Sequence, residues 1–171
     1  QEVSLTELGA QLGMSRETVN SYIDLLEQSF VLFRLKGFSR NLRKEVTKQD
    51  KIYFWDLGVR NIVIDNLNSL TNRNDIGQLW ENLMIVERRK WLDYQSEPGT
   101  HYFWRTHTGA EIDLVEERQG KLFAFEYKWN RARSSYPQTF LETYPNTTFE
   151  VITPANALAH TIPAATASPC S

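Results

Sequence analysis

The residues of this chain best suited to chemistry are two carboxylates and an amine on two neighbouring predicted strands. Asp113 lies in the segment GAEIDLV (109–115), and Glu126 and Lys128 lie in FAFEYKW (123–129). Because side chains alternate along a strand, Glu126 and Lys128 share one face, while the aromatic residues of the same segment occupy the other. A hairpin between the segments brings Asp113 beside them. Two carboxylates that hold a divalent cation, with a lysine next to the reacting water, are the groups of a metal-dependent phosphodiesterase.

Size and composition indicate a globular protein of a reducing compartment. The chain has 171 residues, of which 41% are hydrophobic and 12% aromatic, which is enough to fill a core. The single cysteine, Cys170, cannot form an internal disulfide, and this favours an intracellular location. The sequence contains no signal-peptide pattern and no run of about eighteen apolar residues. We therefore expect no membrane span and a cytoplasmic protein.

Residues 1–65 have the pattern of a winged helix-turn-helix. A short helix opened by the capping serine Ser4 ends at Gly13, and a second helix with apolar residues at helical spacing follows it. The β-rich segments 31–35 and 51–55 flank a basic loop and supply the wing.

Basic residues in this motif and beyond it are candidates for contact with nucleic acid. They are Arg16, Arg40, Arg43, Lys44 and Arg105. Two observations weigh against such contact: the net charge is -2, and the second helix sets Glu17, Asp24 and Glu27 against one basic residue, whereas recognition helices normally carry more positive charge. A strand edge guarded by lysines remains an alternative for the basic loop, as an edge cation does for Arg105.

Residues 76–153 predict the element order α-β-β-β-α-β, with turns between the strands that contain glycine. The asparagine-rich stretch 66–75 is the predicted linker, and residues 154–171, rich in Ala, Pro, Thr and Ser, are predicted to be an irregular tail. The expected elements are a helix over 76–92, strands over 101–105, 110–116 and 122–129, a helix from 134 or 135 to 144, and a strand over 148–152.

This element order, with Glu81 on the first helix and the acids described above on the second and third strands, resembles the PD-(D/E)XK restriction-endonuclease-like superfamily. Further segments extend the resemblance over roughly residues 2–153: KIYFWDLGVRN (51–61), GQLWENLMIVERRK (77–90), YFWRTHTGAEIDLV (102–115) and FAFEYKW (123–129). Together they look like the C-terminal region of predicted bacterial and archaeal AAA-type ATPases, a family of unknown function. The resemblance implies an α/β chain in which a winged helix-turn-helix precedes a restriction-endonuclease-like domain.

The same resemblance implies roles for individual residues. Glu81, Asp113, Glu126 and Lys128 take the catalytic positions, Asp113 and Glu126 would bind Mg²⁺, and Lys128 would position or polarise the attacking water. Other readings of these residues stay open: Glu81 alone fits a first-turn helix acid, and the other three fit a cross-strand ion pair.

Three functions remain as alternatives. The first is the C-terminal part of an AAA-type ATP-binding protein whose nuclease-like domain engages nucleic acid, with Mg²⁺-dependent phosphodiester hydrolysis. The second is a non-catalytic interaction or regulatory module of that ATPase, and the third is a winged-helix regulator that binds DNA. No Gly-x-x-x-x-Gly-Lys-Ser/Thr loop occurs. We therefore expect that this chain has no ATPase activity and that the ATPase module lies outside it.

Overall fold

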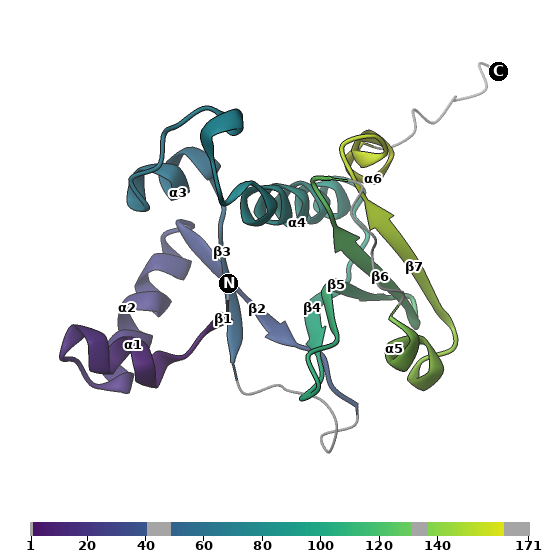
Figure 1. Ribbon diagram of the computed structural model, residues 1–171. Coiled ribbons are helices and arrows are strands. Elements are labelled where there is room, and N and C mark those ends of the chain that lie inside the picture. The colour runs from purple at the N-terminus through teal and green to yellow at the C-terminus, as the bar shows by residue number, and fades with distance from the viewer. Residues whose placement is uncertain (1, 41–48, 131–136, 163–171) are drawn as a thin grey trace.

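The chain folds as a mixed α/β protein with a sheet at its centre. The computed structural model describes residues 2–40, 49–130 and 137–162. Within these residues seven strands form one sheet in the order β1-β3-β2-β4-β5-β6-β7. Helix α4 crosses one side of this sheet, α5 lies below β6 and β7 on the other side, and α1, α2 and α3 flank the β1–β3–β2 end (Figure 1).

The expected α-β-β-β-α-β order is present as α4, β4, β5, β6, α5 and β7. In chain order the elements are β1 Glu2–Val3, α1 Leu5–Leu12, α2 Arg16–Gln28, β2 Leu32–Gly37, β3 Asp50–Phe54, α3 Leu57–Val63, a 3₁₀ turn η1 Leu70–Asn72, α4 Ile76–Tyr94, β4 Thr100–Arg105, β5 Glu111–Arg118, β6 Lys121–Tyr127, α5 Gln138–Thr143, β7 Thr147–Ile152 and α6 Ala157–Thr161.

The first two helices begin and end at the residues that the sequence indicates. The hydroxyl of Ser4 accepts a hydrogen bond from the backbone of Glu7 (3.3 Å), and that of Ser15 accepts one from Thr18 (3.1 Å). Gly13 ends α1 with a φ of 65°, a left-handed conformation that glycine adopts without strain.

These helices pack on the β2–β3 hairpin through a small core of Val19, Ile23 and Leu32. The helices and strands expected for residues 1–65 are therefore present, while most of the basic loop, residues 41–48, lies outside the described residues.

Strand β2 joins the two halves of the chain. It runs parallel to β4, with Lys36 opposite Tyr102 and Gly37 opposite Phe103, and the backbone N–H of Phe38 donates to the carbonyl of Phe103 (2.6 Å). The sheet is thus continuous across the division that the sequence suggests. Because β2 and β4 are far apart along the chain, no local sequence pattern predicts that they pair.

The stretch 66–75, expected as a linker, is held by ion pairs. Asp75 accepts hydrogen bonds from Arg60 (2.9 Å) and from Arg73 (2.9 Å), and Arg73 also donates to the backbone carbonyl of Asn66 (2.7 Å). These contacts hold the 3₁₀ turn η1 next to the start of α4.

Two apolar cores lie on opposite faces of the sheet. Under α4, Trp80 and Ile85 pack with residues of β2 to β7 such as Leu114 and Phe125. On the other face, Phe140 of α5 and its neighbours pack on β4, β5 and β6.

The tail predicted as irregular is partly helical. Residues 157–161 form α6, and Ala157 and His160 are buried. The guanidinium of Arg88 on α4 donates to the backbone carbonyl of His160 (2.9 Å), and the His160 ring bonds the hydroxyl of Tyr127 (3.1 Å). A helix of five residues is too short to show a helical period, so its packing against α4 was not readable from the sequence. Residues 163–171 lie outside the described part of the chain.

The buried ion pair between Arg88 and Glu116 provides a test of how α4 packs on β5. Arg88 donates to both carboxylate oxygens of Glu116 (2.6 and 3.0 Å), and Glu116 is fully buried. Glu116→Ala should lower the free energy of unfolding by about 3–5 kcal/mol in urea titrations, because it leaves a buried guanidinium unpaired. Lys90→Ala, which removes an exposed pair with Glu87 on the same helix, should cost less than about 1 kcal/mol. Equal losses would contradict this account.

Candidate functional site

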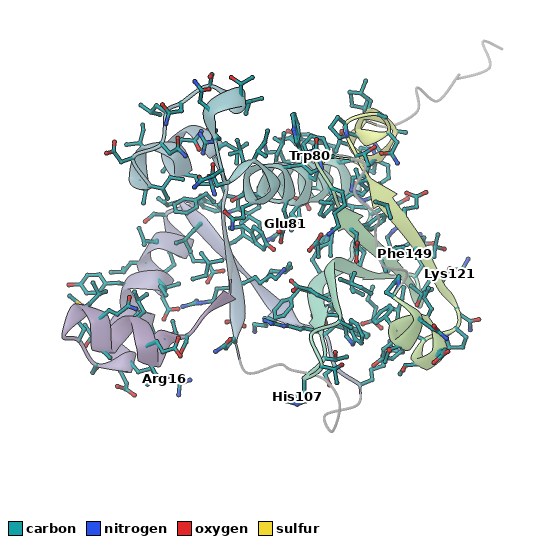
Figure 2. The ribbon with its side chains drawn as sticks, in the orientation of Figure 1. Arg16, Trp80, Glu81, His107, Lys121 and Phe149 are labelled. Atoms are coloured by element: carbon teal, nitrogen blue, oxygen red, sulfur yellow. The ribbon has the colours of Figure 1, made fainter. Side chains whose placement is uncertain are left out.

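Three carboxylates surround the ammonium group of Lys51 between α4 and the sheet. The Lys51 Nζ lies 3.2 Å from Glu81 Oε1 and 3.9 Å from Asp113 Oδ1, and it forms a third ion pair with Glu111. Glu81 lies near the middle of the molecule, on the sheet side of α4 (Figure 2). We call Lys51, Glu81, Glu111 and Asp113 the lysine–carboxylate cluster.

Strand β3 brings Lys51 into this cluster together with Tyr53. The two side chains share one face of the strand and both are buried. The hydroxyl of Tyr53 donates to Glu81. The backbone of Lys51 lies between two strands, opposite Glu2 of β1 and Leu35 of β2, so the position of its side chain is well defined.

A bulge in β5 aims Asp113 at the cluster. Tyr102 lies opposite Val115 and Trp104 lies opposite Ile112, so β5 has one residue more than β4 over this interval. The carboxylate of Asp113 accepts a hydrogen bond from the backbone N–H of Tyr127 on β6 (2.9 Å). The side chain therefore takes the place of a backbone partner at the end of the β5–β6 ladder.

Burial and charge shift the pKa values of the cluster in opposite directions. Burial, with the negative charge of Glu81, raises the pKa of Asp113 to about 7, although Lys51 opposes the shift. Burial alone would raise the pKa of Glu81, but the Lys51 ammonium and the Tyr53 hydroxyl outweigh it, and that pKa lies below its usual value. Burial would lower the pKa of Lys51, yet the three carboxylates more than reverse this and hold the amine protonated.

The other two residues of the predicted site lie at the end of β6. Glu126 is buried, and Lys128 Nζ lies 3.5 Å from Glu126 Oε2. The charge of Lys128 also lowers the pKa of Asp113, so these two groups are within electrostatic range. Of the four predicted catalytic residues, Glu81 and Asp113 thus belong to the lysine–carboxylate cluster. Glu126 and Lys128 form an ion pair of their own, and Glu126 alternates with Phe125 and Tyr127, which face α4.

The cluster, as arranged, does not fit the Mg²⁺ that the resemblance implies. Mg²⁺ requires near-octahedral oxygen ligands, several of them usually water. Among residues 2–40, 49–130 and 137–162, no group of three or more His, Cys, Asp or Glu side chains is disposed to hold a metal ion. The point on which Glu81, Glu111 and Asp113 converge is taken by the Lys51 ammonium.

The sequence analysis missed Glu111, Lys51 and Tyr53, although strand alternation shows which residues of one strand share a face. Glu111 precedes Asp113 by two residues on β5, which places both on one face. Lys51 and Tyr53 have the same spacing on β3. Nothing in the local sequence shows that β3 lies near β5, so the contacts of Lys51 with Glu111 and Asp113 could not be predicted.

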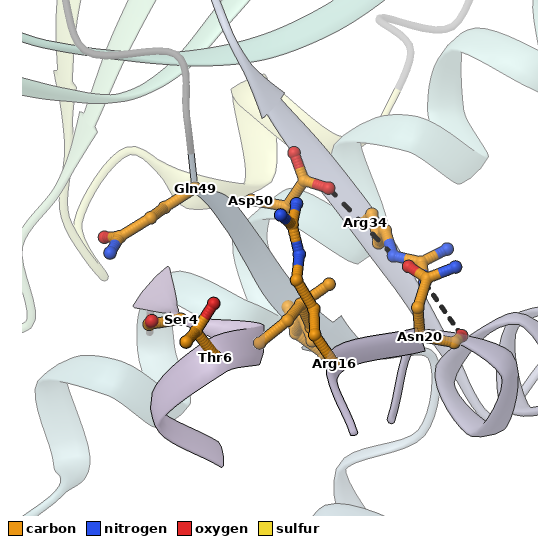
Figure 3. A pocket seen from close by; sticks show the side chains of 9 residues that line it. Ser4, Thr6, Arg16, Asn20, Arg34, Gln49 and Asp50 are labelled. Atoms are coloured by element: carbon orange, nitrogen blue, oxygen red, sulfur yellow. Dashed lines mark hydrogen bonds and ion pairs between the residues drawn. The ribbon is translucent and has the colours of Figure 1, made fainter. Parts of the chain in front are cut away.

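Arg16, expected to contact nucleic acid, lines a pocket of about 440 Å³ between α1, α2 and β3 (Figure 3). The second arginine of this pocket, Arg34, is neutralised by Asp24 and Glu27, each with an oxygen 2.7 Å from its guanidinium. Arg16 lies at the outer edge of the molecule, away from Glu81 (Figure 2). The pocket is therefore separate from the lysine–carboxylate cluster.

The remaining basic candidates come from other elements. Arg40, after β2, pairs with Glu117 of β5, and Arg105 lies on β4 opposite Glu111. Arg43 and Lys44 fall outside the described residues. A role for these side chains in binding nucleic acid stays a prediction.

Comparison with known proteins gives two matches to domains of unknown function. Residues 1–71 match the profile of the domain of unknown function DUF8612, and residues 76–160 match that of DUF4143. The chain is distantly homologous to two uncharacterized mycobacterial proteins, Mb2031c of Mycobacterium bovis and Rv2008c of Mycobacterium tuberculosis. Each is 31% identical over 130 residues, which are 75% of this chain and 29% of the relative. The chain thus matches less than a third of the length of these relatives.

No solved structure matches the chain significantly. A membrane-crossing helix would have to be long and apolar, and none of the helices in the described residues meets both conditions.

The raised pKa of Asp113 predicts a pH-dependent stability. A carboxyl whose pKa is higher in the folded protein contributes stability below its usual pKa near 4, and this is lost as the pH rises through about 7. Asp113→Asn removes this loss. The free energy of unfolding of the variant, compared with that of the unmodified protein, should therefore rise by roughly 2 kcal/mol between pH 5 and pH 8. Urea titrations across this range measure the difference. The half-buried His101 and the buried His160, whose pKa values are lowered by burial, change the stability in the opposite direction but are present in both proteins. A difference that does not change with pH would contradict the assignment.

Proposed function

We propose that this chain is a non-catalytic docking module of a longer ATP-binding protein, built from a winged helix and a restriction-endonuclease-like scaffold. The observation that carries the proposal is the apolar outer surface of α2 and α3, which is suited to another protein surface and unsuited to DNA.

The C-terminal half of α2 and the turn after it expose apolar side chains, while the first turn of the helix exposes the polar Arg16, Glu17 and Thr18. Tyr22, Leu25 and Phe30 are 56%, 57% and 77% exposed, and Leu26 is exposed beside them. In a helix-turn-helix protein the second helix contacts base edges, and basic residues around it contact phosphates. Apolar side chains gathered on an exposed surface instead mark contact with another protein.

Helix α3 also exposes apolar side chains. None of its residues is buried, and Ile62, Val63 and, just beyond the helix, Leu67 are all more than half exposed. The segment after α2 is joined to the segment before α3, because the backbone N–H of Trp55 donates to the carbonyl of Val31 (3.1 Å). We call the exposed apolar residues of both helices, with Phe30 and Leu67, the α2–α3 surface.

The partner we propose for the α2–α3 surface is the ATP-binding module of the same protein. The mycobacterial relatives extend well beyond the aligned part, which is 29% of their length. The resemblance to the C-terminal region of AAA-type ATPases indicates that this additional length contains an ATP-binding module. Permanent interfaces are more hydrophobic than transient ones, so an apolar surface of this kind fits a partner that stays bound.

Mg²⁺-dependent phosphodiester hydrolysis is the second candidate. It is favoured by the placement of Glu81 and Asp113 in one cluster and by the charge of Lys128, which acts on Asp113. This function requires the Lys51 ammonium to leave the carboxylates before a metal ion binds. The third candidate, a DNA-binding regulator, draws support from Arg16 and its pocket, but the apolar face of α2 opposes it.

The docking proposal predicts that a charge on the α2–α3 surface breaks the association. Leu25→Asp should weaken binding of this chain to the separately produced ATP-binding module by roughly 30-fold, the effect of losing about 2 kcal/mol at an interface centre. Gln28→Asp adds the same charge at an exposed polar position of the same helix and should leave the affinity within about threefold. Calorimetric titration measures both, and the melting temperatures confirm that the variants fold. Equal affinities of Leu25→Asp and the unmodified chain would refute the docking surface.

The absence of catalysis is tested on supercoiled plasmid. The chain should produce no Mg²⁺-dependent nick above that of a preparation carrying Asp113→Asn with Lys128→Ala, because the carboxylates are engaged with Lys51. Gel electrophoresis of the plasmid is the measurement. A nick by the unmodified chain that disappears in the double variant would establish the nuclease instead.

A further inference from the structure

We propose that Lys51 is a built-in cation that occupies the point where Glu81, Glu111 and Asp113 converge and excludes a divalent metal ion from it. The lysine comes from β3, and the three carboxylates come from α4 and β5, so the first half of the chain closes a site formed by the second. This inference concerns the lysine–carboxylate cluster and does not depend on the α2–α3 surface.

The position of the ammonium group supports the exclusion. Its distances of 3.2 Å to Glu81 and 3.9 Å to Asp113, with the ion pair to Glu111, place it between all three side chains. The side chain of Lys51 is 5% exposed. A metal ion held by the same oxygens would lie within a few ångströms of this ammonium, and two cations so close, with little water between them, repel each other strongly.

The surroundings keep Lys51 in place. Its backbone is paired on both sides within the sheet, and its Nζ lies 5.5 Å from the centre of the Phe103 ring, which attracts a cation. Tyr53, on the same strand, holds Glu81 toward the lysine. The amine is therefore fixed by contacts from β4, β5 and α4 as well as by its own strand.

The charges explain why removal of Lys51 should reveal a metal site. Glu81, Glu111 and Asp113 all face the Lys51 ammonium, which is the cation that they share. Carboxylate oxygens are the ligands that hard divalent cations prefer. Once the ammonium is gone, a divalent ion restores the charge balance that the lysine provided.

The test compares metal binding by variants of the chain. Calorimetry with Mn²⁺ should show no saturable site in the unmodified protein and one site in Lys51→Met. The affinity of that site should exceed any residual binding by the unmodified protein by about tenfold or more. Adding Asp113→Asn to Lys51→Met should abolish that site. Lys90→Met frees the exposed Glu87 on α4 in the same way and should create none. Mn²⁺ should also raise the melting temperature of Lys51→Met and leave that of the unmodified protein unchanged.

Two results would overturn the proposal. One is a site in the unmodified protein as tight as that in Lys51→Met and lost in Asp113→Asn. The other is a folded Lys51→Met that binds no Mn²⁺.

If Lys51→Met fails to fold, amine labelling of the unmodified protein decides the question. Lys51 should resist reductive methylation equally with and without millimolar Mg²⁺, whereas labelling of Lys51 that Mg²⁺ increases would show that the metal displaces it. None of these measurements involves the ATP-binding module, so failure here leaves the docking surface untouched, and failure of docking leaves this inference standing.

Discussion

The parallel pairing of β2 with β4 is the interaction on which the rest of the structure depends. It sets Lys36 and Gly37 beside Tyr102 and Phe103, and through β2 it fixes the distance from β3 to β5. The amide of Asn82 supports the same arrangement from α4, because it donates to the carbonyl of Phe54 (2.7 Å) and accepts from its N–H (3.0 Å). Without this pairing an amine from the first half of the chain would not meet carboxylates from the second.

Burying several charged groups costs free energy, and apolar packing around them does not offset this cost. Taking a carboxylate and an ammonium out of water is unfavourable unless their geometry and hydrogen bonds compensate for the lost hydration. Here Glu81 has the Tyr53 hydroxyl and Asp113 has the Tyr127 backbone as additional partners. Contacts of this kind are well suited to specify how the two halves fit together, because a misplaced strand would leave each charge without its partner.

The sequence was informative wherever a signal is local. Ser4, Ser15 and Gly13 mark helix ends by side-chain chemistry and backbone freedom, and the alternation in FAFEYKW marks a strand whose aromatic residues face α4. The chemistry at Lys51 was not readable, because it arises from contacts with Glu81 and Glu111, thirty or more residues away in the chain. The direction of Asp113 depends on a bulge whose extra residue is defined by β4. The candidate acids were therefore found by type and spacing, but the cation that faces them required the assembled sheet.

The seating of α6 against α4 determines where a recombinant boundary can be drawn. The repetitive pattern of strands and helices stops at β7, so an expression fragment designed from that pattern would terminate near residue 153. Such a fragment would lack the carbonyl that accepts from Arg88 and the imidazole that bonds Tyr127. It would also uncover the aromatic ring of Phe125, which His160 covers. Poor solubility of that shortened product would reflect the loss of the helix that covers this core, not an intrinsic weakness of the sheet.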